Sequence, residues 1–339
     1  MSTVSTSRAP ISSRMNDDGN STLKPPPRRR RRLGPQGAAT AAALALGSVV
    51  TWFMIRPDNK QTLSTSTWTT FKVKRVTPLT QDSIMITFDV PKHCLISTPP
   101  TQISSLYVMQ PDLQIQRPYT PLDSTCFDPN SDQTECQLVI KRYNDGEMSR
   151  YLHRLKPGDD ITIRGPMTTW SYDLNQLDQI VFIVGGTGIT PVFQFLKSLS
   201  TPNSTTNQCP KIKIIYSSTL SSQILLKSEL DRLVDTINQL NKNVVSIQYL
   251  VDVVDNESQI DKQHQQPLTR GRVDFDKLSD WIPKQTSTTV LDERRKILVC
   301  GPEPMIESIA GRRARDLSQG PVGGLLKQLG YNENEVVKL

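Results

Sequence analysis

The stretch Gln179-Ile-Val-Phe-Ile-Val-Gly-Gly-Thr-Gly-Ile-Thr-Pro191 decides the fold of the second half of the chain. Its apolar first part is typical of a strand buried on both faces, and a helix is expected directly afterwards, over Val192 to Leu199. Strand, glycine turn and helix in this order direct backbone N–H groups at a phosphate. The turn is not the GxGxxG fingerprint, so its position after a strand carries the prediction. We expect a dinucleotide to be bound by Gly185, Gly186, Thr187, Gly188, Thr190 and Pro191.

Strands and a helix alternate along the chain after this stretch. Strands are expected over Ile212 to Tyr216, Val244 to Val251 and Lys296 to Val299, and a helix over Leu226 to Asn241. Such alternation predicts a parallel sheet with right-handed crossovers. We therefore expect residues 173–339 to form an α/β domain.

A cysteine-led motif, Cys300-Gly-Pro-Glu-Pro-Met305, stands at the end of the last of these strands. Ligands bind parallel sheets at the carboxyl ends of the strands, so this motif is expected beside the dinucleotide. The alternative is that Cys300 is a buried thiol with a packing role only.

The first half of the chain carries short β-type runs separated by turns. They cover Thr70 to Val76, Ile84 to Val90, Ser105 to Met109, Gln137 to Tyr143 and Asp160 to Arg164, with no convincing amphipathic helix between them. Closely spaced short strands predict a small antiparallel β-barrel that removes its edges by closing on itself. Residues 123–135 are expected to be a surface loop.

Within this barrel, Gln116-Arg-Pro-Tyr-Thr-Pro121 places a guanidinium, a ring and a hydroxyl close together. On an extended strand Arg117 and Tyr119 project to one side, whereas Thr120 needs its main chain or a local twist to join them. Arg117 can pair with a pyrophosphate oxygen, Tyr119 can stack on an isoalloxazine, and Thr120 can reach its N5. The pattern predicts a flavin site.

Two further segments support the flavin site. Lys141-Arg-Tyr143 repeats the alternation of cation and ring, and Gly146 leads into a short helix whose free N–H groups at Met148 and Ser149 suit a phosphate. The alternative is a surface turn at Arg117 and a simple helix cap at Gly146.

Residues 68–339 resemble the ferredoxin reductase superfamily, and most closely the fungal NADH-cytochrome b5 reductases, on the strength of these motifs in this order. The resemblance implies a two-domain α+β fold, with an FAD-binding antiparallel β-barrel at 68–172 and an NAD-binding parallel-sheet α/β domain at 173–339. It implies FAD and NADH as cofactors, with Cys300 placing the nicotinamide for hydride transfer and Asp252 favouring NADH by repelling a 2′-phosphate. It also places Pro118, Gly301, Pro302 and Met305 at the cofactors.

The sequence departs from this family at several positions. Glu147 stands where these reductases usually have a lysine near the flavin phosphates, and Ser222 and Gln223 replace a common acidic pair. A scaffold that has lost flavin is one reading of the Glu147 change.

The N-terminal part of the chain suggests a membrane anchor. Residues 1–36 form a basic targeting segment, expected to be disordered, that contains Arg28 to Arg32; residues 37–55 run without a charge and are predicted to be a transmembrane helix, followed by a linker at 56–67. A targeting segment and a buried core helix are the alternatives for 37–55. The arginines and the Ser/Thr bias favour a mitochondrial inner membrane with the flavodomain in the intermembrane space; the outer membrane and the endoplasmic reticulum are alternatives.

Charge and cysteine usage exclude other classes of function. Residues 1–56 hold nine Lys or Arg and two Asp, so they carry the whole net charge of +7 and the rest of the chain is balanced. No nucleic-acid surface is expected from a balanced body. The five cysteines and three histidines lack metal-ligand spacing, so no metal site is predicted. Cys126 and Cys136 could pair in an oxidising compartment.

Two functions remain open from the sequence. The first is an enzyme that passes electrons from NADH through FAD, one at a time, to a haem protein such as cytochrome b5. The second is a mitochondrial inner-membrane flavoprotein that assists cytochrome c maturation by keeping haem or the apocytochrome reduced.

Overall fold

The computed structural model describes residues 62–95, 99, 101–132, 134–200, 209–241, 244–255, 268–282, 294–316 and 318–339. The predicted targeting segment 1–36 and transmembrane helix 37–55 lie outside these residues. Within them, the longest apolar helices are all too short to cross a membrane.

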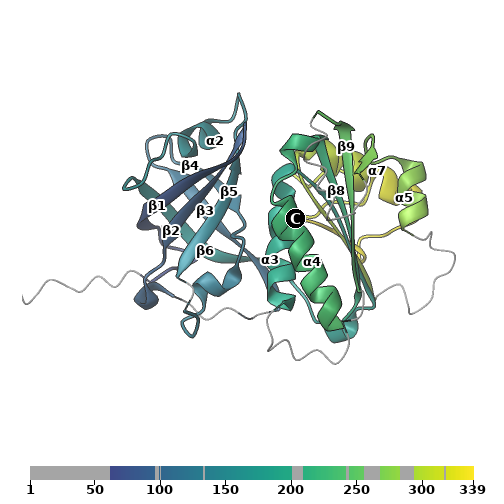
Figure 1. The fold of residues 1–339 in the computed structure, drawn as a ribbon, viewed down its shortest axis with the longest axis horizontal. Coiled ribbons are helices and arrows are strands. Elements are labelled where there is room, and N and C mark those ends of the chain that lie inside the picture. The colour runs from purple at the N-terminus through teal and green to yellow at the C-terminus, as the bar shows by residue number, and fades with distance from the viewer. Residues whose placement is uncertain are drawn as a thin grey trace, which may run out of the picture. The chain divides into compact units, whose positions relative to one another are not determined.

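The first domain is a six-stranded antiparallel sheet that curls strongly (Figure 1). Its order is β4-β3-β6-β1-β2-β5, so five pairs of neighbours are hydrogen-bonded. Along β1, buried and exposed residues alternate as a half-buried strand requires. The strands are β1 (Thr69–Thr80), β2 (Ser83–Asp89), β3 (Gln102–Gln110), β4 (Ile115–Tyr119), β5 (Glu135–Lys141) and β6 (Asp160–Ser171).

The sheet does not close completely into the barrel that the sequence predicted. Between the two end strands β4 and β5, the described residues show no hydrogen-bonded pairing, so a seam separates them. The helix α2 (Glu147–Leu152) contacts both strands and buries Met148 and Leu152, which covers the seam at one end. Strand β5 also ends at Lys141, so Tyr143 lies beyond the strand predicted to include it.

The predicted surface loop at 123–135 is wrong in its first part. Residues Ser124–Phe127 form a 3-10 turn, and Cys126 and Phe127 are fully buried in the core of the curled sheet. The Asp123 carboxylate accepts a hydrogen bond from the Thr125 N–H at 2.9 Å, which turns the apolar pair inward. Cys126 contacts Cys136 there, and both are free thiols.

Part of the predicted linker at 56–67 packs against the first domain. Leu63 is 1% exposed in the same core, and its N–H bonds to the Cys94 carbonyl at 2.9 Å. Residues 65–67 are exposed.

The second domain is a six-stranded parallel sheet in the order β10-β9-β8-β7-β11-β12. The strands predicted from the sequence are all present, and two short edge strands were missed. The strands are β7 (Gln179–Gly185), β8 (Lys211–Leu220), β9 (Val245–Val253), β10 (Leu268–Arg270), β11 (Arg295–Cys300) and β12 (Val336–Lys338).

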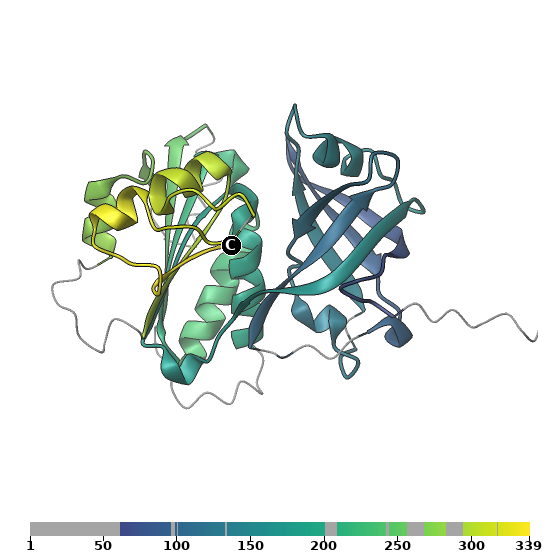
Figure 2. The same cartoon turned by 180° about the vertical axis from the view of Figure 1, so that it is seen from behind.

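Helices cover both faces of this sheet (Figures 1 and 2). Along β7, Ile180, Phe182 and Val184 pack on the side of α3 and α4, whereas Val181 and Ile183 pack on the side of α5, α6 and α7. This double burial explains the unbroken apolar run in the sequence. The helices are α3 (Ile189–Leu199), α4 (Lys227–Asn241), α5 (Phe275–Trp281), α6 (Glu303–Ala310) and α7 (Gly324–Gln328).

The parallel sheet changes direction between β7 and β11. From β7 the chain builds outward through β8, β9 and β10, and then returns to the other side of β7 with β11. Such a switch point leaves room for a ligand outside the carboxyl ends of the two central strands. The glycine turn and Cys300 follow these two strands.

We predict that Phe127→Ala lowers the free energy of unfolding by about 3–5 kcal/mol, because it empties a fully buried site. Urea unfolding would measure this. The control is Asn130→Ala, an exposed position in the same segment, which we expect to change the value by less than about 0.5 kcal/mol. Equal, small effects would mean that the segment is the surface loop the sequence suggested.

Candidate active site

Three glycines allow the two central strand ends to pack against each other at the switch point. A Cβ atom on Gly188 would lie 2.2 Å from the Cys300 carbonyl oxygen, and one on Gly185 would lie 2.4 Å from the Met305 sulfur. A Cβ on Gly301 would lie 3.1 Å from the same sulfur. The Gly188 contact is with main chain and excludes any other residue, whereas the two contacts with Met305 involve a side chain that can shift. The glycine turn and the cysteine-led motif therefore lie packed together at the switch point.

Gly186 differs from these glycines. Its φ of +54° is in the left-handed region, and a Cβ there would meet nothing within 4 Å. The turn therefore presents open main chain to the pocket at this point. After it, the Thr190 hydroxyl donates to the Thr187 carbonyl at 3.0 Å, and Pro191 stands in the first turn of α3.

Cys300 ends β11 beside Val184 of β7. The residue is partly exposed, yet burial of its thiol raises the pKa to about 12, against the opposing effect of the nearby Arg313 charge. The thiol is therefore protonated at neutral pH, which suits a positioning contact and not a thiolate nucleophile.

A pocket of about 540 Å³ joins residues from both domains. From the curled sheet it includes Lys141 and Tyr143, and from the parallel sheet it includes the glycine turn, the end of β8, and α6. Its full lining is Lys141, Tyr143, Gly185, Gly186, Ser217, Ser218, Thr219, Asp252, Arg272, Val273, Pro302, Pro304, Met305, Ser308 and Ile309.

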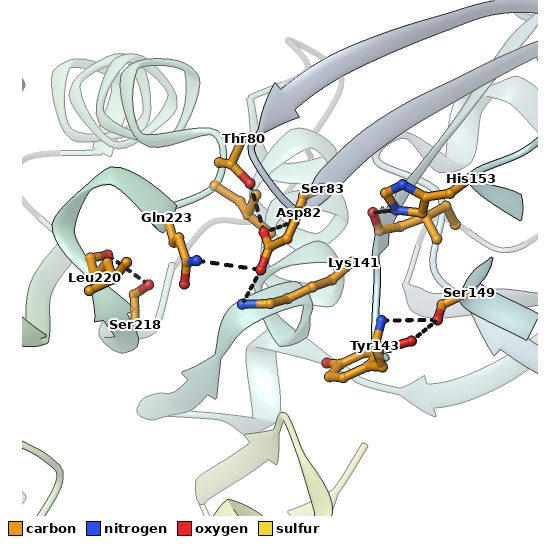
Figure 3. Close-up of polar contacts among 12 residues, drawn as sticks. Thr80, Asp82, Ser83, Lys141, Tyr143, Ser149, His153, Ser218, Leu220 and Gln223 are labelled. Carbon is orange, nitrogen blue, oxygen red and sulfur yellow. Dashed lines mark hydrogen bonds and ion pairs between the residues drawn. The ribbon is translucent and has the colours of Figure 1, made fainter. Parts of the chain in front are cut away.

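Lys141 is held at the pocket wall by an acidic residue of the β1–β2 turn (Figure 3). Its ammonium lies 3.2 Å from the Asp82 carboxylate, which also accepts hydrogen bonds from Thr80 and Ser83 at 2.9 Å. Burial would raise the pKa of Asp82, but these three donors outweigh it and lower the pKa. Gln223 of the second domain donates to the same carboxylate at 3.4 Å, so Asp82 also joins the two domains.

Tyr143 reaches across to the glycine turn. Its ring is 47% exposed, and its hydroxyl hydrogen-bonds the Thr187 side chain. Burial of part of the ring is the main cause that raises its pKa. The ring thus stands where the two predicted cofactor sites meet.

The predicted flavin strand lies on one side of the seam. Arg117 is exposed and its guanidinium donates only to the neighbouring Gln116 carbonyl among the described contacts, at 2.8 Å. Pro118 is exposed beside it, and Tyr119 is half-buried, with a pKa that burial raises against the nearby Arg117 charge. A free guanidinium and a ring side by side fit the predicted roles.

Thr120 leaves the strand and turns inward. It is 8% exposed, and its hydroxyl lies 3.0 Å from the Ser105 hydroxyl, which also bonds Thr169 at 2.9 Å. The hydroxyl is therefore engaged within the domain, which favours the main chain of Thr120 for the predicted contact near a flavin.

Some polar groups of the segment at Gly146 form hydrogen bonds with one another. The Ser149 hydroxyl accepts from the Tyr143 N–H at 3.0 Å and donates to the Gly146 carbonyl at 2.9 Å, and Met148 is buried. The N–H groups at this helix start have no acceptor within the helix, so they stay candidates for a phosphate. Glu147 stands where the resembled reductases usually have a lysine, and it forms an ion pair with Arg150. The Arg150 guanidinium partly offsets the negative charge of Glu147.

Asp252 lies next to the last residue of β9 and lines the pocket, where the sequence placed a ribose contact. Arg272 lies against it, with Nε 3.0 Å from the carboxylate. The Arg272 side chain is 83% exposed, so its two terminal nitrogens face solvent at the pocket. Asp252 is thus paired with a cation, Arg272, that the sequence did not reveal.

The residues present fit both dinucleotides. The glycine cradle, which a Cβ would fill, and the open main chain at Gly186 suit a pyrophosphate. The free Arg117 guanidinium and the Tyr119 ring at the seam suit a flavin nucleotide. Among the described residues no group of three His, Cys, Asp or Glu side chains is placed to hold a metal.

Comparisons with known proteins agree with this geometry. The profile of the family described as "Oxidoreductase FAD-binding domain" matches residues 70–172, and that described as "Oxidoreductase NAD-binding domain" matches residues 182–311. NADH-cytochrome b5 reductase 2 of Lodderomyces elongisporus is 33% identical over 277 residues, which cover 80% of this chain and 83% of the relative. The chain belongs to the cytochrome b5 reductase family. It is an NAD(P)H-dependent FAD oxidoreductase, as the resemblance implied.

Other relatives extend this result. NADH-cytochrome b5 reductase 2 of Candida glabrata is 31% identical, and the match covers 89% of this chain and 93% of the relative. The crystal structure of the cytochrome b5 reductase domain of Ulva prolifera nitrate reductase superimposes with a TM-score of 0.58 at 21% identity, over 82% of this chain and 99% of that one. The latter shows that the fold is shared.

Several pocket residues were missed in the sequence. Ser217, Ser218 and Thr219 lie at the carboxyl end of β8, next to the switch point, so strand order would have found them once the sheet was known. Arg272 lies just after β10, and Ser308 lies on α6 beyond the Cys300–Met305 motif, so neither belongs to a recognisable motif.

We predict that Gly188→Ala destabilises the protein by about 3 kcal/mol, because its Cβ would collide with main chain that cannot move aside. Helix propensity alone would predict that Gly188→Ala stabilises the protein, because Gly188 has a helical φ of −61° and alanine is the better helix former there. Gly186→Ala in the same turn should cost only about 1 kcal/mol, from its backbone alone. Urea unfolding that showed the reverse order would contradict the packing described here.

We predict that Arg272→Ala raises the preference for NADH over NADPH about tenfold in kcat/KM, because it removes the cation available to a 2′-phosphate while leaving the repelling Asp252 carboxylate. Arg232→Ala, at an equally charged and exposed site on α4, is the control and should leave the ratio unchanged. A preference for NADH that stayed the same in Arg272→Ala would exclude this cation from cofactor selection.

Proposed function

We propose that this chain takes a hydride from NADH onto FAD and passes the electrons, one at a time, to a haem protein such as cytochrome b5. In the balanced reaction NADH becomes NAD⁺, two haem irons gain one electron each, and one proton is released. The observation that carries the proposal is the single pocket in which Tyr143 and Lys141 of the FAD-binding domain meet the glycine turn of the NAD-binding domain. The printed name of the fungal relatives supports the haem acceptor.

The protein's own residues bind and orient the two cofactors. FAD, when bound, converts one two-electron hydride into two single-electron transfers. Arg117 and Tyr119 would hold it at the seam, and the Gly185–Gly188 turn would hold the NADH pyrophosphate. Lys141, fixed by Asp82, would face the phosphates or ribose as a preplaced cation.

The packing of the strand ends supports a role for Cys300 beside the nicotinamide. Because its thiol stays protonated, it adds no charge next to the ring from which the hydride departs. Pro302 and Met305 line the pocket and would form the adjoining wall, and Gly301 connects them to Cys300. Asp252 would contact the ribose, and it favours NADH to the extent that Arg272 does not neutralise it.

We further propose that the chain is anchored in a mitochondrial inner membrane through residues 37–55, with its flavodomain in the intermembrane space. The uncharged stretch and the arginines before it support this placement. They equally support the second candidate, a flavoprotein that assists cytochrome c maturation. In a protease-protection experiment on intact organelles, a cytosolic flavodomain would exclude the second candidate, whereas a protected flavodomain is compatible with both.

The proposed function is tested by anaerobic titration of the full-length, FAD-loaded chain with NADH. We expect the flavin absorbance to bleach within the mixing time and to return on adding oxidised cytochrome b5. Arg117→Ala should lower the affinity for FAD about 10- to 100-fold, from the loss of a charge-assisted contact, whereas Arg75→Ala on the outer face of β1 should not.

Three outcomes would change the proposal. A colourless protein that FAD cannot reconstitute would show a scaffold without flavin. A flavin that NADH does not bleach would show that the second domain does not deliver a hydride. Faster reduction of free haem or apocytochrome c than of cytochrome b5 would favour the maturation factor.

A further inference from the structure

One buried side chain of α3 connects the two predicted cofactor sites. Gln194 is 1% exposed, although it is polar and lies in the middle of a helix. Its Oε1 accepts from the Ser104 N–H at 2.8 Å, and its Nε2 donates to the Ser104 carbonyl at 3.1 Å and the Pro121 carbonyl at 2.9 Å. The carboxamide of an NAD-domain helix is thus fully bonded to the main chain of the FAD domain.

These bonds replace a strand that has ended. β4 pairs with β3 only as far as Tyr119, opposite Leu106, so Ser104 has no β4 partner on that side. On the other side, the β3–β6 ladder is irregular between Ile103 and Ser104. The Gln194 amide supplies both the donor and the acceptor that a neighbouring strand would have given to Ser104.

The same amide fixes the end of the predicted flavin segment. Pro121 directly follows Thr120, whose hydroxyl bonds Ser105, the neighbour of Ser104. Gln194 therefore holds both strands of this corner, β3 through Ser104 and the exit of β4 through Pro121. Tyr119 and Thr120 lie immediately before the held residue.

The other end of the connection is the glycine turn. Gln194 lies in the second turn of α3, which begins at Ile189 directly after that turn. At 1.5 Å of rise per residue, the amide is within about 8 Å of the helix start along the axis. The Gly188 main chain is in turn packed on the Cys300 carbonyl, so the connection reaches the nicotinamide side without a flexible joint.

We propose that Gln194 is a positioning residue for hydride transfer: its carboxamide sets the position of the Tyr119–Pro121 flavin segment relative to the nicotinamide site at the glycine turn. This inference rests on the proposed function. In that reaction one hydride, a proton with two electrons, leaves the nicotinamide and is received by the flavin. Transfer requires the reacting atoms within about 3–3.5 Å, and a misplacement of 1 Å costs roughly a hundredfold in rate.

The test compares Gln194→Leu and Gln194→Glu with the full-length, FAD-loaded protein, with Gln239→Glu on the exposed face of α4 as the control. The leucine keeps the size of the side chain but makes none of the three bonds. The glutamate replaces the donating nitrogen by an oxygen that faces two carbonyls, which raises the pKa of the new carboxyl. Only its protonated form restores a donor.

The first readout does not depend on turnover. Hydrogen exchange at Ser104 should be at least tenfold faster in Gln194→Leu than in the natural protein, with or without FAD. In Gln194→Glu the protection factor of the Ser104 amide, which corrects for the intrinsic slowing of exchange at lower pH, should rise as the pH is lowered through the carboxyl pKa, whereas in Gln194→Leu it should stay constant.

The second readout is flavin reduction in anaerobic stopped flow. At saturating NADH we expect Gln194→Leu to be about 10- to 100-fold slower, with a larger isotope effect from 4-deuterated NADH and an unchanged FAD content. Gln194→Glu should recover speed at low pH, and Gln239→Glu should match the natural protein throughout.

The outcomes are separable from those of the proposed function. If NADH fails to bleach the flavin of the natural protein, the proposed function itself is wrong and the inference falls with it. If the natural protein is bleached and Gln194→Leu reduces its flavin at the same rate with the same isotope effect, Gln194 positions nothing and only this inference is overturned. Should Gln194→Leu not fold, the pH-dependent recovery of Gln194→Glu decides, and its absence overturns the inference.

Discussion

Close contact between the ends of two adjacent parallel strands is the constraint on which the site depends. The Gly188 main chain lies so near the Cys300 carbonyl that a Cβ would come within 2.2 Å of it. This contact forces glycine into the turn, directs the first turn of α3, and leaves open main chain at Gly186 facing the pocket. The apolar strand before the turn is then buried on both faces because helices must cover both sides of the sheet from which the turn emerges.

The curled sheet solves a different problem. A fully closed barrel would have no free strand edge along which to seat a long nucleotide, whereas the seam between β4 and β5 leaves one edge of each strand unpaired. The unpaired edges of such a seam would normally invite association with another strand. Here α2 covers one end, and on the β3 strand the Gln194 carboxamide takes over main-chain bonding where β4 stops.

Local patterns in the sequence predicted the elements well and their environments less well. Apart from the short edge strands β10 and β12, the strands of both sheets and the helices α3 and α4 follow from the sequence pattern, because each buries a continuous stripe of side chains. The loop at 123–135 was misread because its polar residues outnumber Cys126 and Phe127, and two apolar side chains in a turn show no period. Asp82, Gln194 and Arg272 escaped notice for a related reason. Each acts through a partner distant in sequence, and a lone polar residue in a strand turn, a helix or the segment after an edge strand does not reveal that partner.

Two ion pairs at the pocket hold cationic side chains in position and still leave donors for anionic ligands. Lys141 is paired with Asp82 and Arg272 with Asp252, so the two cations of the pocket wall are held in position by carboxylates of their own domains. The Arg272 pair is exposed and made through one nitrogen, and such pairs contribute only about 0–1 kcal/mol. A phosphate can therefore take the remaining donors of Arg272 at little cost. Lys141 is less exposed, and Asp82 has three other donors, so this pair fixes geometry more firmly. The wall is consequently rigid where the two domains meet and adaptable at its outer end, where the part of the nucleotide farthest from the flavin would lie.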